Sequence, residues 1–428
     1  MQPEQIYYSF CSLVTDPAQY RAMVQSFVAA GFEAGLCEYL QADNSAGGSA
    51  DGYTGLNKLI TKAKGRYVVL LHQDVIAFDS KDHLDQILAN LTQADPNWAV
   101  AGNAGCDATG ALHIRITDRH GFDARLREPA QQVMSLDENF IILRKDSAVR
   151  FSDDLSGFHL YGTDIVFQAH LQGRSAYVVD FHLEHLGKGE IDQSFVTCMQ
   201  AFQRKYSRLG QGLQIKTPST RVSLGPRSYG TWLWQRKLAR RVARGTAAAW
   251  SHRLKWLTGH AADLWYRQIL GRGYVLDGIR LELPDAAPLG LRKLLRQGRY
   301  LQGEAAMIAK HLRDDLPVVL HGPQLSLLTP HVRRAIGLGQ DIVTVESLGT
   351  DLPDRPWALV TAEADRLFDL LQHQPTALAN CQMIVLSLRP VVLHDSGRTV
   401  SGLMSTLGQA GFQQIEAQKA ALVLRRAA

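Results

Sequence analysis

Asp74 is the residue of this sequence best placed to do chemistry, because it follows the apolar segment that ends in Leu70-Leu71-His72-Gln73. If that segment is a parallel strand, Asp74 lies at the carboxyl edge of the sheet, where α/β proteins bind ligands. A carboxylate there can hold a hard divalent cation, which stabilises negative charge on a diphosphate leaving group. The alternative is a loop or helix-cap carboxylate without a ligand.

Asp164 and two histidines are further candidates. Asp164 opens a predicted helix, where it can act as a general base with a pKa raised by desolvation, or can serve only the helix dipole. His182 and His185 end the same half of the chain. Imidazole is a suitable ligand for a manganese-like ion, and His185 is the better candidate because it comes just before Gly187 in a predicted strand. A lone histidine in a strand is also a common structural residue.

These candidates need a sheet to hold them, and the first half of the sequence predicts one. Strand patterns alternate with helical patterns in a βαβαβ order, which is typical of a parallel sheet covered by helices. The loops that follow Val14, Leu40 and Leu71 should therefore meet at one edge of the sheet. The predicted strands are 6–14, 34–40, 67–75, 98–104, 133–143 and 175–183, and the predicted helices are 18–30, 53–62, 161–171 and 192–208.

The sequence after residue 273 alternates again and predicts a second α/β domain. Its expected strands are 279–283, 318–320, 342–346, 358–361, 383–388 and a final pair within 412–424, with a helix at 303–312. The segment before it holds five of the seven tryptophans and is strongly basic. We therefore expect a first domain at 1–215, a basic helical connector at 216–272 and a second, Rossmann-like domain at 273–428.

Composition narrows the class of protein. A chain of 428 residues is long enough for two or three cores. Its five cysteines lie far apart, which argues against a disulfide framework or a thiolate metal site. The first residues lack the pattern of a signal peptide, and no segment reaches the roughly 20 apolar residues of a membrane-spanning helix. These features predict a cytoplasmic protein.

The connector, with its tryptophans from Trp232 to Trp265, is predicted to form two amphipathic helices with cationic faces. Such helices bind anionic membrane surfaces, and their apolar faces can equally pack between two domains. Both alternatives stay open. We expect no nucleic-acid partner, because the rest of the chain is slightly acidic and no recognised module is present.

Over most of residues 1–210 the sequence resembles the StrF-type branch of the family-two glycosyltransferases. The resemblance implies a GT-A domain with a mixed, mainly parallel sheet. The order and spacing of the shared motifs agree with that branch throughout. These motifs are Phe10-Cys11-Ser12-Leu13-Val14, Ala63-Lys64-Gly65-Arg66-Tyr67, His72-Gln73-Asp74-Val75, Gly157-Phe158-His159-Leu160-Tyr161-Gly162-Thr163-Asp164 and the segment from His182 to Gly187.

The resemblance also implies a site. Asp74 and His185 would hold Mn²⁺ or Mg²⁺, and Asp164 would take a proton from the acceptor hydroxyl, so that transfer inverts the anomeric carbon. The usual Asp-x-Asp of the wider family is His72-Gln73-Asp74 here, which removes one carboxylate. The residues implied to bind the nucleotide-sugar donor are Cys11, Ser12, Val14, Asn44, Ser45, Tyr53, Asn57, His72 and Gln73.

From about Gly278 onward the sequence resembles the FkbM-type methyltransferases, through Ile279-Arg280-Leu281 and through Arg299-Tyr300 with Glu304. The cofactor turn of that family is eroded. His321 replaces an acidic residue, Pro323 removes a backbone donor, and only Gly322 remains of the glycines. Glu346 could still meet a ribose hydroxyl. We expect a degenerate domain that does not bind S-adenosylmethionine and serves packing, acceptor recognition or assembly.

The sequence thus predicts an enzyme, a glycosyltransferase that moves a sugar from a nucleotide diphosphate to a hydroxyl acceptor. The acceptor would be a glycan or a lipid-linked molecule in surface-polysaccharide assembly, in the cytoplasm or at the inner face of the cytoplasmic membrane. One alternative is a non-catalytic scaffold with two eroded enzyme folds, which His72 in place of an acid would support. Another is an active S-adenosylmethionine-dependent methyltransferase.

Overall fold

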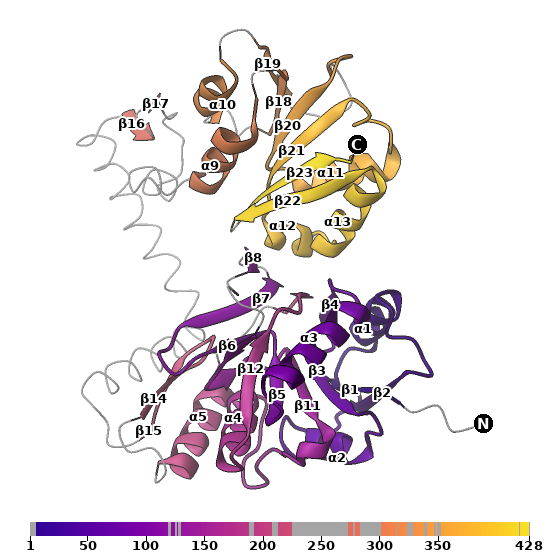
Figure 1. Ribbon diagram of the computed structural model, residues 1–428, viewed down its shortest axis with the longest axis vertical. Coiled ribbons are helices and arrows are strands. Elements are labelled where there is room, and N and C mark those ends of the chain that lie inside the picture. The colour runs from indigo at the N-terminus through magenta and orange to yellow at the C-terminus, as the bar shows by residue number, and fades with distance from the viewer. Residues whose placement is uncertain are drawn as a thin grey trace. The chain divides into compact units, whose positions relative to one another are not determined.

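The computed structural model describes two compact α/β units (Figure 1). Unit 1 is Met1–Arg119 with Asp123–Val242, and unit 2 is His120–Phe122 with Ala243–Ala428. The predicted fold class of two α/β domains is confirmed, whereas the boundaries at residues 215 and 272 stay predictions. The described residues are 6–118, 121–124, 126, 130–187, 192–207, 213–224, 273–276, 279–282, 301–313, 315–322, 328–337, 340–345, 348, 352–418 and 420–427.

A seven-stranded mixed sheet forms the centre of unit 1. Its order is β2 (Cys37–Asp43), β1 (Tyr8–Val14), β3 (Tyr67–Leu71), β11 (Phe140–Arg144), β5 (Trp98–Gly102), β12 (Ser175–Val179) and β9 (Ala130–Gln132). Strands β2, β1 and β3 are parallel, as are β5 and β12, whereas β11 and β9 run antiparallel to their neighbours. This arrangement is consistent with the GT-A domain that the sequence predicts.

Unit 1 has a second sheet, and three of the strands predicted from the sequence are split between the two sheets. Its order is β10 (Ser135–Leu136), β6 (Ala104–Cys106), β7 (Leu112–Asp118), β13 (Leu183–His185) and β4 (Val75–Ala77), and β8 (Gly121–Ala124) pairs with β7. The strand expected at 67–75 corresponds to β3 followed by β4. The strand expected at 133–143 corresponds to β10 followed by β11, and the strand expected at 175–183 corresponds mainly to β12. Residues 72–74 therefore form a turn between the two sheets.

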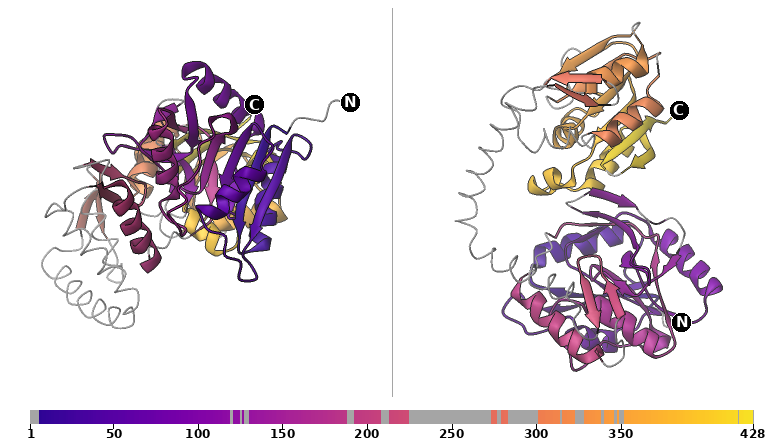
Figure 2. Two further views of the ribbon diagram at one scale, coloured as in Figure 1. Left: turned by 90° about the horizontal axis from the view of Figure 1, so that it is seen from below. Right: turned by 90° about the vertical axis from the view of Figure 1, so that its left-hand side faces the viewer.

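Helices cover both faces of the seven-stranded sheet (Figure 2). One core includes side chains of α2 (Thr54–Lys62), α4 (Tyr161–Leu171) and α5 (Gln193–Tyr206), and the other includes side chains of α1 (Pro17–Ala29) and α3 (Lys81–Ala94). Val68 and Leu70 of β3 face the first core, and Val69 and Leu71 face the second. A strand that is buried on both faces is apolar at every position, which is why β3 is an uninterrupted run of apolar residues.

Unit 2 contains a six-stranded sheet. Its order is β19 (Ile342–Val345), β18 (Val318–His321), β20 (Trp357–Thr361), β21 (Cys381–Ser387), β23 (Ala421–Arg426) and β22 (Phe412–Gln418). The first four strands are parallel, and β23 is antiparallel to both of its neighbours. The parallel strands fit the second α/β domain expected from the sequence. The likeness to methyltransferases stays a prediction, and Pro323 and Glu346 lie outside the described residues.

The sheet of unit 2 also has two covered faces. Side chains of α9 (Gln302–His311) and α10 (Thr329–Ile336) form a core with Val318 and Leu320 of β18. Figure 1 shows α11 (Ala364–His373), α12 (Pro390–Asp395) and α13 (Val400–Gln409) on the other face. Because side chains alternate along a strand, Val319 and His321 belong to that second face.

The remaining described elements are short. They are the 3₁₀ turn η1 (Lys145–Ser147) and the hairpins β14 (Leu213–Lys216) with β15 (Arg221–Leu224) and β16 (Gly273–Leu276) with β17 (Ile279–Glu282). None of the helices in the described part of the chain is both long and apolar enough to cross a membrane. The expected connector helices, with Trp232 to Trp265, lie outside that part.

Candidate functional site

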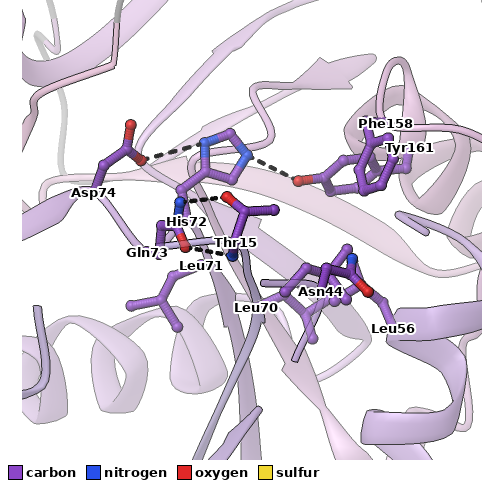
Figure 3. Close-up of a pocket in the computed structure, with 11 residues that line it drawn as sticks. Thr15, Asn44, Leu56, Leu70, Leu71, His72, Gln73, Asp74, Phe158 and Tyr161 are labelled. Atoms are coloured by element: carbon purple, nitrogen blue, oxygen red, sulfur yellow. Dashed lines mark hydrogen bonds and ion pairs between the residues drawn. The ribbon is translucent and has the colours of Figure 1, made fainter. Parts of the chain in front are cut away.

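A pocket opens at the carboxyl ends of the three parallel strands β1, β2 and β3, where the topology predicts a ligand site. Its volume is about 270 Å³. Strand ends, the start of α4 and one residue of α2 contribute to its wall (Figure 3). The lining residues are Leu13, Thr15, Asn44, Leu56, Leu70, Leu71, His72, Gln73, Asp74, Phe158 and Tyr161.

One edge of this pocket carries a cluster of His72, Asp74 and His185. The Nε2 atom of His185 lies 3.4 Å from Asp74 Oδ1, and the Nδ1 atom of His72 lies 3.9 Å from the same oxygen. The two ring nitrogens are 3.4 Å apart. Antiparallel pairing of β13 with β4 brings His185 to this place from far along the chain, with His185 opposite Val75. The three ligand atoms lie within 4.8 Å of one another.

Hydrogen bonds fix which nitrogen of His72 faces the cluster. The Tyr161 hydroxyl donates to the carbonyl oxygen of Glu138 at 3.2 Å, and it lies 2.9 Å from Nε2 of His72. Because that hydroxyl has one proton, which it gives to the carbonyl, it accepts from Nε2–H of His72. The lone pair of Nδ1 is then available toward Asp74 and His185. This is the arrangement by which a neighbouring group orients a metal-binding histidine.

The electrostatics of the cluster pair Asp74 with His185. Burial opposes ionisation of Asp74, but its hydrogen bond to His185 and the charges of both histidines outweigh burial and lower its pKa to about 2. Burial also opposes charge on His185, yet Asp74 and more distant carboxylates raise its pKa. The pKa of His72 is lowered, mainly by burial, so this ring stays neutral. Asp74 and His185 therefore form an ion pair beside a neutral imidazole, and a metal ion bound here would replace the proton of His185.

Gly187 leaves the space beside this cluster open. A Cβ at this position would lie 2.6 Å from Asp74 Oδ2 and 2.8 Å from His185 Nε2, so any other residue here would displace these two side-chain ends. The donor set, one carboxylate with two imidazoles, fits a transition ion such as Mn²⁺ better than Mg²⁺, which prefers oxygen ligands. The residues present therefore fit the metal that the sequence predicts. The structure also adds His72 to the pair expected from the sequence.

Gln73 and Asn44 line the pocket but use their side chains to hold its loops. The Oε1 atom of Gln73 accepts from the backbone nitrogens of Thr15 and Asp16 at 2.8 and 2.9 Å, and its Nε2 donates to Thr15 Oγ1 at 2.8 Å. Asn44 donates to the oxygen of Ala50 at 2.7 Å and accepts from the nitrogen of Ala50 at 3.1 Å. Both amides thus shape the pocket rather than offer it free polar groups.

Three residues of β1 that the sequence assigned to the donor pocket do not line it with their side chains. Cys11, Ser12 and Val14 are buried in the unit, whereas Leu13 and Thr15 reach the pocket. The reason is the alternation of side chains along a strand, which puts Ser12 and Val14 on the face opposite Leu13. Cys11 lies on the same face as Leu13 but deeper, within the core under α2.

The other assigned donor residues also lie outside the pocket wall. Ser45 is in an exposed turn in which its nitrogen and hydroxyl both donate to Asp43. Tyr53 is buried, and its hydroxyl donates to the His159 oxygen at 2.9 Å. The side-chain amide of Asn57 donates to the backbone oxygen of Phe151 at 2.9 Å and accepts from its backbone nitrogen at 3.0 Å. Tyr53 and Asn57 therefore anchor the segment that leads into α4, and that segment carries Phe158 and Tyr161.

Asp164 lies in the core of unit 1, and its side chain is fully buried. Its carboxylate accepts from the Ser152 nitrogen and hydroxyl at 2.8 and 2.6 Å and from the Tyr206 hydroxyl at 2.5 Å. Gln168 donates to both hydroxyls at 2.9 Å, so their protons point to Asp164. Burial raises the pKa of Asp164, as expected for a desolvated acid. The hydrogen-bond donors of this carboxylate belong to the protein core, and its role as a base stays a prediction.

Two adjacent acids at the pocket edge were missed from the sequence. Strand β11 runs antiparallel to β3, with Phe140 opposite Leu71, so the residues before β11 lie beside the turn after β3. The His72 nitrogen donates to the Asn139 oxygen at 3.1 Å, which places Asp137 and Glu138 next to the cluster. Burial, followed by the charge of Asp137, raises the pKa of Glu138 to about 8. The only signal in the sequence is an acidic pair before an apolar strand.

Comparisons with known proteins give one clear relative. The chain is 37% identical over 225 residues to the "ATP synthase subunits region ORF 6" protein of Fuscovulum blasticum, which covers 51% of this chain and 90% of that protein. No family model matches. Among solved structures, S. aureus TarS in complex with UDP-GlcNAc aligns at TM-score 0.34 and 13% identity, over 47% of this chain and 66% of that one. A protein from STIV aligns at TM-score 0.29 and 11% identity, over 52% and 96%.

Proposed function

The chain belongs to the same family as the ATP synthase subunits region ORF 6 protein of Fuscovulum blasticum, and from the site of unit 1 we propose that it is a metal-dependent glycosyltransferase. Its donor is a nucleotide diphosphate sugar, and its acceptor is a hydroxyl of a glycan or a lipid-linked molecule. The observation that carries the proposal is the cluster of His72, Asp74 and His185 at the edge of a pocket formed by parallel strand ends. Three of the motifs that resemble family-two glycosyltransferases contribute residues to this same pocket, through Leu13, His72 to Asp74, and Phe158 with Tyr161.

Each residue of the cluster has a role in this proposal. Asp74, His185 and Nδ1 of His72 would hold the ion. A bound divalent ion would act as a Lewis acid that stabilises the charge on the departing diphosphate. Gly187 keeps the approach to Asp74 clear. Leu13, Leu56 and Leu70 offer an apolar wall to the nucleoside.

Glu138 is the proton acceptor that we propose for the attacking hydroxyl. Its backbone carbonyl is linked to His72 through the Tyr161 hydroxyl, and its carboxylate accepts from backbone nitrogens of Leu160 and Gly162 at the start of α4. A pKa of about 8 suits a base that works near neutral pH. We expect Glu138→Gln to lower kcat by at least about 100-fold with little change in donor KM. Asp164→Asn should mainly lower stability. An unchanged kcat in Glu138→Gln would remove this assignment.

The test of the function is calorimetric titration of the full chain with UDP, GDP and dTDP, each with and without Mn²⁺. We expect one nucleotide to bind at least about tenfold more tightly with Mn²⁺, because a bound cation would offset the negative charge of the diphosphate. Asp74→Asn should remove this difference.

Asp107→Asn is the matched control for that titration. Asp107 is also bonded to a histidine, His113, at 2.9 Å, and its pKa is likewise lowered to about 2, but it does not line the pocket. The control should bind nucleotide and Mn²⁺ as the parent chain does. If the folded parent chain binds none of the three nucleotides, the proposal is wrong.

A further inference from the structure

Phe158 is an exposed aromatic residue in the wall of the pocket of unit 1. It is 54% exposed and lies on the side of the pocket that holds Tyr161 (Figure 3). A single exposed hydrophobic residue on an open surface is ordinary, but an aromatic ring in a pocket wall is a common contact for a ligand. What distinguishes Phe158 is this position together with the way in which its backbone is held.

The backbone is fixed on both sides of Phe158. The nitrogen of Gly157 donates to Asp51 Oδ2 at 3.2 Å. The carbonyl oxygen of His159 accepts from the Tyr53 hydroxyl at 2.9 Å. These two hydrogen bonds tie the residues before and after Phe158 to the segment that leads into α2. The exposure of the ring is therefore not that of a loosely held loop.

Two residues of this segment have a left-handed backbone. Gly157 has a φ of 104°, and Leu160, which is buried and directly precedes α4, has a φ of 64°. A left-handed conformation costs free energy in a residue other than glycine, and such positions cluster where a ligand or a catalytic group is held. The turn that presents Phe158 is thus set before a ligand arrives, which lowers the entropy cost of binding against the ring.

The segment that presents Phe158 also holds the proposed proton acceptor. The carboxylate of Glu138 accepts hydrogen bonds from the backbone nitrogens of Leu160 and Gly162. The three leucines that we assign to the nucleoside belong instead to β1, α2 and β3. A molecule that stacks on Phe158 therefore lies on the side of the pocket that holds the base. This position favours the acceptor over the nucleoside as its occupant.

A phenyl face suits one part of a sugar acceptor. The ring of a hexose has a face of C–H groups and carries its hydroxyls around the rim. The face of an aromatic ring is negative and attracts polarised hydrogens, while the hydroxyls at the rim stay free for hydrogen bonds. An open-chain polyol has no such preformed face, and it must fix several torsions to make one, which costs conformational entropy. Phe158 should therefore favour cyclic over open-chain acceptors.

We propose that Phe158 is the platform on which the pyranose ring of the acceptor stacks, with one hydroxyl of that ring directed to Glu138. The acceptor is then a cyclic sugar of a glycan, and an open-chain polyol or a simple alkyl alcohol is a poor substitute. This inference rests on the proposed function for the role of Glu138. The stacking of a sugar ring on Phe158, however, can be measured without sugar transfer.

The test is a saturation-transfer NMR titration of the full chain with methyl β-glucoside, methyl β-galactoside and methyl α-mannoside. Glucitol is the open-chain probe, and uridine and guanosine are the nucleoside probes. We expect at least one hexoside to bind about tenfold more tightly than glucitol, with the strongest transfer to the C–H protons of one ring face. The proposal is overturned if no hexoside binds, if glucitol binds as tightly, or if only nucleosides bind through Phe158.

Variants locate the binding. Phe158→Ala should weaken hexoside binding by about tenfold and remove the preference over glucitol, whereas Phe158→Trp keeps an aromatic face and should retain both. Leu171→Ala is the matched control, because Leu171 is 56% exposed and belongs to α4 but does not line the pocket. Equal hexoside binding by the Phe158→Ala and Leu171→Ala variants would contradict the proposed platform.

Failure of this inference differs from failure of the proposed function. A chain that binds a nucleotide with Mn²⁺ but binds hexosides equally in the two alanine variants keeps the function and loses the platform. A chain that binds hexosides through Phe158 but none of the three nucleotides keeps a sugar-binding platform and loses the transferase.

Discussion

Histidines end a central parallel strand in both units, and their surroundings differ. His72 follows β3 and faces a carboxylate and a second imidazole, whereas His321 ends β18 and meets a threonine hydroxyl. Burial is the largest influence on both rings and lowers the pKa of each. In unit 1, however, Asp74 reverses this effect at His185 and raises its pKa. A histidine at the same strand edge thus belongs to a charged cluster in unit 1 and to a neutral pair in unit 2, and the difference is one carboxylate.

The largest expected effect comes from removing that carboxylate. Asp74→Asn should lower the affinity for Mn²⁺ by at least about 100-fold, because one ligand and the negative charge of the cluster are lost. The pKa of His185 should fall at the same time, since burial then acts with less opposition. Calorimetry measures the first change, and proton–nitrogen NMR of the metal-free protein measures the second. An unchanged pKa of His185 would mean that Asp74 does not set its charge.

A smaller effect should follow from releasing His72. Tyr161→Phe removes the hydroxyl that holds Nε2 of His72, so the ring can rotate or change its tautomer. We expect the affinity for Mn²⁺ to fall about tenfold, in the range found for residues that orient metal ligands. Tyr39→Phe is the control, because it deletes a hydroxyl that also donates to a carbonyl oxygen, that of Phe32 at 2.8 Å, but lies away from the cluster. Equal losses in the two variants would assign the effect to packing alone.

The smallest expected effect concerns the dependence of stability on pH. His321 has a pKa of about 4 in the folded chain and about 6.5 when unfolded. The unfolded state therefore binds the extra proton between these values, and the stability that neutral His321 contributes is complete above pH 6.5 and is lost as the pH falls toward 4. Relative to His321→Gln, the free energy of unfolding of the parent chain should fall by about 1.4 kcal/mol more per pH unit in this window.

Urea denaturation at several pH values measures that slope. Both proteins share every other titrating group, including buried His182 with its pKa of about 3, so the difference between the two slopes isolates His321. Parallel slopes would show that His321 is not neutral and buried in the folded state.

Much of the frame of unit 1 could be predicted from the sequence. The helix expected at 161–171 is α4. The first three strands expected from the sequence are β1, β2 and β3, with their ends shifted by a few residues. These elements are local patterns of period 2 or 3.6, or uninterrupted apolar runs, which a single segment displays by itself. The meeting of the loops after β1, β2 and β3 follows from parallel order alone.

The details of the site could not be predicted, because they depend on pairings between distant segments. Only the antiparallel pairing of β11 with β3 brings Glu138 beside His72, and only the pairing of β13 with β4 brings His185 to Asp74. Strand β1 is buried on both faces, so no polar alternation reveals that Leu13 rather than Ser12 reaches the pocket. The role of Asp164 is set by Ser152 and Tyr206, whose proximity no local pattern displays.

Tyr161 joins two parts of unit 1 that different ligands would occupy. It begins α4, its ring lines the pocket, and its hydroxyl holds the imidazole of His72. Any molecule that displaces this ring when it binds must also change the affinity of the cluster for its ion. Thermodynamic reciprocity then requires the ion to change the affinity for that molecule by the same factor. The affinity for the proposed ion and the affinity for such a molecule would therefore be coupled through one phenol group.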